Sequence, residues 1–173
     1  LGDKTILDMV VDKISEVEDV ENIYIVTNEK FHTHFEDWAK EYKGVKGIKV
    51  LNDHTTSNDN RLGAIGDLKY VIDQENIDDE ILVMASDNIF GFSLVDFVDM
   101  YKQKNADMIC AHKIENKQEL HSMGVVELDK AGKVLSFEEK PENPKSDLGV
   151  PPFYLYRRET LPLINDYLKE GNN

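Results

Sequence analysis

The fold of this chain is decided by the stretch Ile81-Leu82-Val83-Met84-Ala85-Ser86-Asp87-Asn88, in which an unbroken apolar run leads directly into polar residues. An apolar run of strand length without alternation is typical of a strand that is covered on both faces. In open α/β sheets, ligands bind beyond the carboxyl ends of the strands. The stretch therefore predicts a central strand over 81–84, followed by a loop that can carry a functional group.

On both sides of this stretch, apolar runs of strand length alternate with segments of helical periodicity. Further strands are predicted at 23–26, 48–51, 106–111 and 153–156, and helices over 6–17, 31–42, 61–72, 93–101 and 161–168. The polar residues 52–60 predict a loop. This order predicts an α/β fold with a mostly parallel mixed sheet.

Two local patterns refine this prediction. Ser93 and Asp96 are spaced as in a capping box, and a buried stripe is predicted behind them at Leu94, Phe97, Val98 and Tyr101. The segments 124–128 and 134–138 flank Asp129-Lys130-Ala131-Gly132, which has the composition of a turn between two strands. We therefore expect a β-hairpin addition to the α/β core.

Composition limits the class of protein. The chain has 173 residues, with 20 Lys plus Arg against 34 Asp plus Glu, so its formal net charge is −14. This negative field argues against a nucleic-acid partner. No signal-peptide pattern opens the chain, and no apolar run approaches the roughly 18 residues that span a bilayer. We expect a single domain over 1–173 in the cytoplasm, with no membrane partner.

Asp87 is the first candidate site residue. A carboxylate that follows a central strand can hold a hard cation such as Mg²⁺ against phosphate oxygens. The alternative is that Asp87 only caps or turns the chain between strand and helix. Its position alone favours neither interpretation.

A second candidate is the junction Arg61-Leu62-Gly63-Ala64-Ile65-Gly66, where the polar loop enters a helix. Glycine lets the backbone approach a flat ligand such as a nucleobase, and the amino end of a helix favours anions. The alternative is that Gly66, which falls inside the helical pattern, packs closely against a neighbouring element.

The third candidate is Ser136-Phe137-Glu138-Glu139-Lys140-Pro141, at the end of a strand. Alternation places Glu138 and Glu139 on opposite faces of the strand. Lys140 suits a phosphate, and Glu139 can accept hydrogen bonds from sugar hydroxyls. A solvated, salt-bridged edge is the alternative.

The remaining reactive residues predict no site. His32 and His34 are spaced so that they point apart on a helix, and no other histidine or cysteine matches a metal-binding spacing. Cys110 lies in an apolar segment, where a buried, inert thiol is expected.

Taken in order, these segments resemble the sugar-1-phosphate nucleotidylyltransferases, the family that includes glucose-1-phosphate thymidylyl- and uridylyltransferases. The resemblance rests on Gly2-Asp3-Lys4, Leu62-Gly63-Ala64, Ser86-Asp87-Asn88, Met123-Gly124-Val125-Val126-Glu127 and Glu138-Glu139-Lys140-Pro141. It implies a Rossmann-like nucleotide-binding domain that condenses a nucleoside triphosphate with a sugar 1-phosphate. The products are an NDP-sugar and pyrophosphate, and the cofactor is Mg²⁺.

The resemblance also implies a role for each matching residue. Gly63 would lie against the nucleobase and Asp87 would hold the metal. Gly124 would leave room for the sugar, Glu139 would accept its hydroxyls and Lys140 would bind its phosphate. Asp87 and Lys140 would then be the catalytic residues, and we expect them to face one cleft.

Family members begin with a strand and a Gly-rich loop that cradles the triphosphate, whereas this chain starts after that loop and stops before a second metal-binding aspartate. We therefore expect a domain that is incomplete at both ends and inactive by itself. Two other functions stay open: a non-catalytic nucleotide-sugar-binding sensor, and a nucleotide-sugar-dependent glycosyltransferase. The base, the sugar and the presence of a homo-oligomer are also open.

Overall fold

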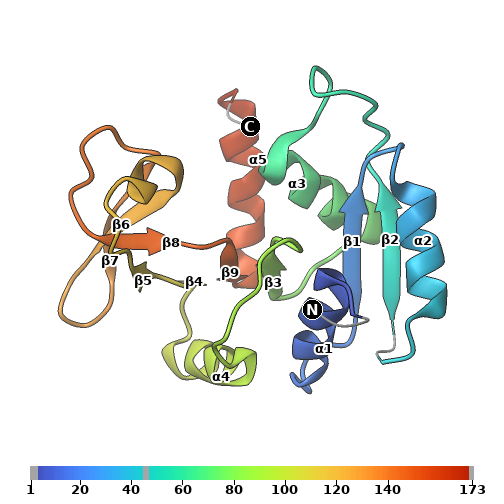
Figure 1. Ribbon diagram of the computed structural model, residues 1–173, viewed down its shortest axis with the longest axis horizontal. Helices are drawn as coiled ribbons and strands as arrows, with labels where there is room; N and C mark the ends of the chain where they lie inside the picture. Colours follow the sequence, from blue (N-terminus) through green and yellow to red (C-terminus); the bar gives the residue numbers. More distant parts are fainter. Residues whose placement is uncertain (1–3, 45–46, 172–173) are drawn as a thin grey trace. The chain divides into compact units, whose positions relative to one another are not determined.

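The chain folds as two units in the computed structural model shown in Figure 1, which describes residues 4–44 and 47–171. The first unit takes in residues 1–80, 86–105 and 157–173, and the second takes in 81–85 and 106–156. Gly2 and Asp3, which belong to the motifs quoted above, lie outside the described residues. The expectation of one domain over the whole chain stays a prediction.

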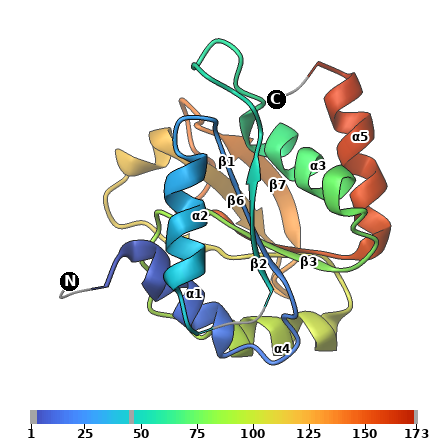
Figure 2. The ribbon, with the colours of Figure 1, turned by 90° about the vertical axis from the view of Figure 1, so that its right-hand side faces the viewer.

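A βαβ arrangement forms the sheet of the first unit. Strand β1 (Ile23–Thr27) pairs in parallel with β2 (Ile48–Asn52), with each strand's first and last residues in register with those of its neighbour. Helix α2 (His32–Glu41) connects the two strands and packs against β2 (Figure 2). Parallel pairing brings the carboxyl ends of both strands to the same edge, where the loops that follow them meet.

Helix α1 (Ile6–Ser15) begins with a complete capping box that the sequence analysis missed. The Thr5 hydroxyl accepts a hydrogen bond from the Asp8 backbone N–H at 3.1 Å, and the Asp8 carboxylate accepts one from the Thr5 backbone N–H at 2.7 Å. The helix buries Val10 and Val11. Its start is therefore determined by local chemistry and its orientation by the apolar face.

Helix α4 (Leu94–Lys104) confirms the predicted buried stripe, because Leu94, Phe97, Val98 and Tyr101 are all buried. Of the two hydrogen bonds of the predicted capping box, the described residues show only the one to the serine hydroxyl. Ser93 Oγ accepts a hydrogen bond from the Asp96 N–H at 3.1 Å, and the described part of the chain shows no return bond from Ser93 to the Asp96 carboxylate.

Two further helices pack against each other in the first unit, α3 (Gly63–Glu75) and α5 (Leu161–Lys169), as Figure 2 shows. Helix α3 starts two residues later than predicted. It ends at Asn76, whose φ of 51° is left-handed, a conformation that asparagine tolerates. The short 3₁₀ helix η2 (Arg158–Thr160) leads into α5.

In the second unit, β9 (Phe153–Tyr156) lies between β3 (Ile81–Met84) and β4 (Met108–Ile109) and runs antiparallel to both. Phe153 and Leu155 are buried in this sheet. The strand predicted over 106–111 is correspondingly shorter, because only two of its residues pair with β9.

A second antiparallel sheet contains the predicted hairpin. Its strands, in spatial order, are β5 (His112–Lys113), β8 (Leu148–Val150), β6 (Gly124–Leu128) and β7 (Val134–Glu139). The hairpin turn is closed by Asp129, whose Oδ1 accepts hydrogen bonds from the N–H groups of Ala131 and Lys133, each at 2.8 Å. On one face of the sheet, Val125 packs with Ile114 and with Leu120 of the 3₁₀ helix η1 (Glu119–Ser122).

The prediction of a mostly parallel sheet is wrong for the described strands. Only β1 and β2 pair in parallel, and every other strand pair in the described residues is antiparallel. The unbroken apolar run 81–84 indicates burial but carries no information on the direction of the neighbouring strand. The direction of the strand next to β3 is that of β9, which lies much later in the chain.

Within the described residues, no helix has both the length and the apolar character needed to cross a bilayer.

Candidate functional site

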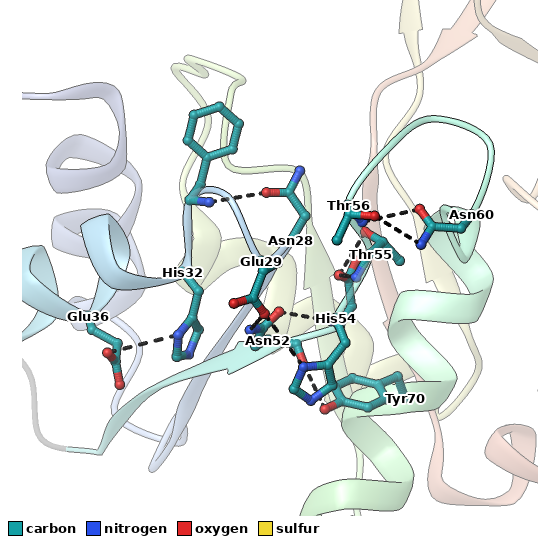
Figure 3. Close-up of polar contacts among 12 residues, drawn as sticks. Asn28, Glu29, His32, Glu36, Asn52, His54, Thr55, Thr56, Asn60 and Tyr70 are labelled. Carbon is teal, nitrogen blue, oxygen red and sulfur yellow. Dashed lines mark hydrogen bonds and ion pairs between the residues drawn. The ribbon is translucent and has the colours of Figure 1, made fainter.

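A polar network lies at the carboxyl edge of the β1–β2 pair (Figure 3). The Asn52 side-chain amide donates to Glu29 Oε2 at 2.6 Å, and Asn52 Oδ1 accepts from the His54 backbone N–H at 2.8 Å. The hydroxyl of Tyr70, on α3, donates to the Asn52 carbonyl at 2.7 Å. This network fixes the start of the predicted loop at the edge where open α/β sheets bind their ligands.

The rest of this loop is held by its own side chains. Asp53 Oδ1 accepts hydrogen bonds from the backbone N–H and the hydroxyl of Thr55, at 2.7 and 2.8 Å, and Thr55 is buried. Farther along, Asn60 Oδ1 accepts from the N–H groups of Thr56 and Ser57. The segment is thus a loop, as predicted, but one with a defined shape.

The loop leads into a surface depression of about 480 Å³. This depression is lined by Arg61, Gly63, Ala64 and Asp67. Gly63 has a φ of +78°, which strains any residue that carries a Cβ. No side chain caps the start of α3 in the part of the chain that the structure describes. The first backbone N–H groups of α3 therefore remain suited to a ligand oxygen.

Asp67 is a residue of this depression that the sequence analysis missed. Burial, together with the neighbouring Asp53 carboxylate, raises the pKa of Asp67 to about 6. Its Oδ1 is buried and accepts no hydrogen bond from the residues that are described. The available signal was its spacing, since a residue four positions after Gly63 lies on the same face of a helix.

Gly66 has a local packing reason. A Cβ built on Gly66 would lie 2.8 Å from the Cβ of Leu62, which is closer than real side chains approach. The contact is with the residue that precedes the helix and not with a neighbouring element. Close packing against a neighbouring element, the alternative given for Gly66, is therefore not found among the described residues, and the constraint on a side chain at this position comes from Leu62.

Asp87 lies in an exposed turn between β3 and α4. Its Oδ1 accepts a hydrogen bond from the Asn88 side-chain amide at 2.7 Å. Among the described residues, no three His, Cys, Asp or Glu side chains gather as a metal site. A single exposed carboxylate still fits Mg²⁺, which commonly takes one or two protein carboxylates and completes its shell with phosphate oxygens and water.

The hairpin brings Gly124 and Glu139 together, because they are direct cross-strand partners. A Cβ built on Gly124 would lie 3.5 Å from Glu139 Oε2 and only 2.6 Å from Cζ of Phe137. The space above Gly124 is therefore occupied by the ring of Phe137, with the Glu139 carboxylate beside it. Sequence reasoning assigned no role to this ring.

Lys140 follows the last residue of β7 with a φ of +46°, and its N–H donates to the Met123 carbonyl at 3.1 Å. Its Nζ lies 3.4 Å from Glu139 Oε1, in an exposed ion pair. The less exposed Glu138 instead pairs with Lys145 at 2.8 Å. The two glutamates point to opposite faces of the strand, as predicted. Both form ion pairs with lysines, as the alternative of a solvated, salt-bridged edge expected.

The structure thus brings Gly124, Glu139 and Lys140 together in the second unit. In the first unit, no hydrogen bond or ion pair joins Gly63 to Asp87 in the described residues. Asp87 and Lys140 belong to different units. The expectation that they face one cleft stays a prediction.

The structure also bears on the residues that were not expected to form a site. His32 Nδ1 lies 3.9 Å from Glu36 Oε2, a helical neighbour (Figure 3). Burial raises the pKa of Cys110 to about 11, which makes its thiol a poor nucleophile at neutral pH. The prediction of an inert cysteine is consistent with this environment.

Comparison with known sequences identifies one family. The profile of the family described as "Nucleotidyl transferase" matches residues 1–173. The chain is 29% identical over 100 residues to glucose-1-phosphate adenylyltransferase 1 of Vibrio parahaemolyticus, a match that covers 55% of this chain and 25% of the relative. It is 27% identical over 166 residues to the bifunctional protein GlmU of Methanocaldococcus jannaschii, which covers 95% of this chain and 35% of the relative.

A third relative differs from the adenylyltransferase in the base and in the 1-phosphate that its name contains. Valienol-1-phosphate guanylyltransferase of Streptomyces hygroscopicus is 33% identical over 82 residues, covering 47% of this chain and 22% of that protein. The chain therefore spans about a third or less of these curated relatives.

Among solved structures, the fold is similar to that of a putative glucose-1-phosphate thymidylyltransferase from Bacillus anthracis. The TM-score is 0.76 at 21% identity, over 95% of this chain and 62% of that one. An apo UDP-glucose pyrophosphorylase gives a TM-score of 0.74 at 14% identity, over 95% of this chain and 69% of its own. At these identities the likeness shows the fold alone.

Proposed function

Because this chain belongs to the nucleotidyl transferase family, whose matching relatives are sugar-1-phosphate nucleotidylyltransferases, we propose that it supplies substrate-binding residues for joining a nucleoside triphosphate to a sugar 1-phosphate. The observation that carries this proposal is the arrangement at the end of the hairpin. There a hydroxyl-accepting carboxylate, Glu139, lies 3.4 Å from an ammonium group, Lys140. A sugar 1-phosphate offers the two complementary groups, hydroxyls and a phosphate.

On the sugar side, Glu139 accepts hydrogen bonds from the sugar hydroxyls and Lys140 binds the phosphate. Both side chains are about 60% exposed, so a ligand can reach them without the chain unfolding. The left-handed φ of Lys140 supports this assignment, because strained backbone in a residue other than glycine clusters at functional sites. The phosphate replaces Glu139 as the partner of the Lys140 ammonium.

On the nucleotide side, Gly63 lies against the base. Gly63 places no side chain on the wall of the depression, its positive φ disfavours any residue that would, and Arg61 provides a cation on the same wall. The amino end of α3, which no side chain of the described residues caps, favours a negatively charged ligand.

Asp87 is the proposed metal ligand. Bound Mg²⁺ would neutralise charge on the phosphate oxygens during the transfer. The Asn88 amide, which donates to Asp87 Oδ1, orients the carboxylate. The hydrogen bond would hold the carboxylate in a defined rotamer.

The proposed reaction is an in-line attack by an oxygen of the sugar phosphate on the α-phosphorus of the triphosphate. The new P–O bond forms as the bond to the β-phosphate breaks, and pyrophosphate leaves with that electron pair. Lys140 positions the attacking phosphate and reduces its repulsion from the triphosphate, which is the main demand of phosphoryl transfer. No covalent enzyme intermediate is required.

The test is a panel of the common nucleoside triphosphates against a panel of sugar 1-phosphates, scored by pyrophosphate release from the complete encoded protein with Mg²⁺. Release for one base and one sugar supports the proposal and identifies both. A protein that binds an NDP-sugar without releasing pyrophosphate would be a sensor, and one that transfers sugar from a supplied NDP-sugar would be a glycosyltransferase. The cytoplasmic location and a homo-oligomer stay predictions.

A further inference from the structure

The hairpin carries an exposed aromatic ring, that of Phe137, which has no role in the proposed reaction described above. Phe137 lies on β7 two residues before Glu139, so both side chains are on the same face of the strand. Phe137 is 48% exposed, although Val126, its direct cross-strand partner in the same sheet, is buried.

The tip of the ring lies against Gly124. A methyl group built on Gly124 would lie 2.6 Å from Phe137 Cζ and 3.1 Å from Cε2. Glycine at 124 therefore lets the ring lie close against the β6 backbone. The same methyl group would lie 3.5 Å from Glu139 Oε2, so the ring edge and the carboxylate border a single position on the strand.

An aromatic face beside a carboxylate is the combination that recognises a pyranose. One side of a pyranose ring presents mainly C–H groups, which pack well against an aromatic ring, whereas its edge presents hydroxyls. Small-molecule sites generally combine apolar walls with a few well-placed polar groups. On this hairpin, the wall would be Phe137 and the polar groups would be Glu139 and Lys140.

We propose that the ring of Phe137 is the apolar wall of the sugar subsite, against which one C–H face of a pyranose 1-phosphate packs while Glu139 accepts its hydroxyls. This inference rests on the proposed function and adds a specificity-determining residue to it. Sugars with an axial hydroxyl on the packed face would be disfavoured, because the hydroxyl would lose its water against the ring. Gly124 then acts through Phe137, by allowing the ring to take this position.

The competing explanation is that Phe137 only covers the β6 backbone. Single exposed apolar residues are common on protein surfaces and need no function. The variant Phe137→Leu separates the two explanations, because leucine keeps an apolar cover over Gly124 but has no aromatic face. Leu135→Ala is a matched control, since Leu135 is an exposed apolar residue of the same strand.

The experiment uses the complete encoded protein with glucose, galactose and mannose 1-phosphates. In Phe137→Leu we expect the KM for the preferred sugar 1-phosphate to rise about tenfold, with the KM for the triphosphate unchanged. Leu135→Ala should leave both values unchanged. In proton NMR of each sugar 1-phosphate with the wild type, ring protons of the bound sugar should shift upfield, and this shift should disappear in Phe137→Leu.

These two measurements distinguish the failure of this inference from that of the proposed function. In one outcome, the wild type releases pyrophosphate, Phe137→Leu changes the KM for the sugar 1-phosphate less than twofold, and no upfield shift is seen. That outcome overturns the role of Phe137 as the apolar wall. In another outcome, the protein binds a sugar 1-phosphate with the Phe137-dependent shift but releases no pyrophosphate. That outcome supports the role of Phe137 as the apolar wall and contradicts the proposed transferase activity. A wild type that binds none of the three sugars overturns the wall as well.

Discussion

The indole N–H of Trp38 donates a hydrogen bond to Asp8 Oδ1 at 2.9 Å, joining α2 to the start of α1. The same carboxylate closes the capping box with Thr5. Hydrogen bonds from the Thr5 hydroxyl and backbone, and from Trp38, lower the pKa of Asp8 below its usual value. One side chain thus fixes both the beginning of a helix and its contact with the next helix.

Replacing Asp8 by alanine should therefore lower the free energy of unfolding by about 1–3 kcal/mol, since a cap and a bond between helices are lost together. Urea denaturation at pH 7 measures this. Because the pKa of Asp8 is depressed in the folded state, its contribution is present above about pH 4 and is lost as the pH falls below that. Asp37→Ala is the control, because Asp37 is exposed and, among the described residues, pairs with Lys40. Equal losses in the two variants would contradict the double role.

The contact between Gly124 and Phe137 predicts a coupled pair. Gly124→Ala should cost about 1 kcal/mol of stability, because the added methyl group must displace the far end of the half-exposed Phe137 ring. In a Phe137→Ala background the same change should cost much less. A double-mutant cycle of unfolding free energies measures the coupling, which we expect to exceed about 0.5 kcal/mol. Additive effects would mean that the ring does not occupy the space above Gly124.

Asp67 predicts a pH-dependent stability. With a pKa of about 6 in the folded state against 3.8 as the ordinary value, the folded protein holds a proton that the unfolded chain releases. Stability therefore falls as the pH rises from about 4 to 6, and the full penalty remains above that range. Asp67→Asn should raise the free energy of unfolding at pH 7.5 by about 1 kcal/mol, a figure reduced for partial solvent exposure, and much less at pH 4.5.

The matched control for Asp67→Asn is Asp59→Asn, which removes the same charge from an exposed loop. We expect this control to change the stability equally little at the two pH values. An Asp67→Asn variant with the same effect at pH 4.5 and pH 7.5 would show that burial beside Asp53 does not raise the pKa.

We expect the thiol of Cys110 to be alkylated slowly in the folded protein. Because burial raises its pKa to about 11, the folded protein should react with iodoacetamide at pH 8 about 100-fold more slowly than the chain unfolded in urea. Mass spectrometry of the alkylated product at timed intervals gives both rates. Similar rates in the two states would show that the thiol is accessible and ionised in the fold.

Local patterns in the sequence predicted local structure well. The stripe of α4 and the hairpin turn at Asp129 were both located, because helical periodicity and turn chemistry depend on residues close in sequence. Strand direction could not be predicted in this way. It depends on β9, which pairs with β3 about seventy residues earlier in the chain, and a strand's composition does not specify the direction of its partner.

The candidate sites show the same division. The motif ending in Glu139 and Lys140 was recognisable because its residues are consecutive, and the hairpin register then placed Gly124 beside them. Phe137 and Asp67 were missed for a different reason. Their importance comes from contacts across strands or from burial beside another loop, and neither can be inferred from residue type alone.

We propose that this chain belongs to an enzyme that makes an NDP-sugar with the help of the Asp87 carboxylate. The most direct measurement is ³¹P NMR of the complete encoded protein with Mg²⁺, a nucleoside triphosphate and a sugar 1-phosphate, in the wild type, Asp87→Asn and Asp99→Asn. Asp99 is the control, because it is an exposed carboxylate on α4 that has no assigned role. We expect the signals of NDP-sugar and pyrophosphate to grow together in the wild type and in Asp99→Asn, and to grow at least about 100-fold more slowly in folded Asp87→Asn. Equal rates in all three proteins would contradict the role of Asp87, and the absence of both products in the wild type would contradict the transferase itself.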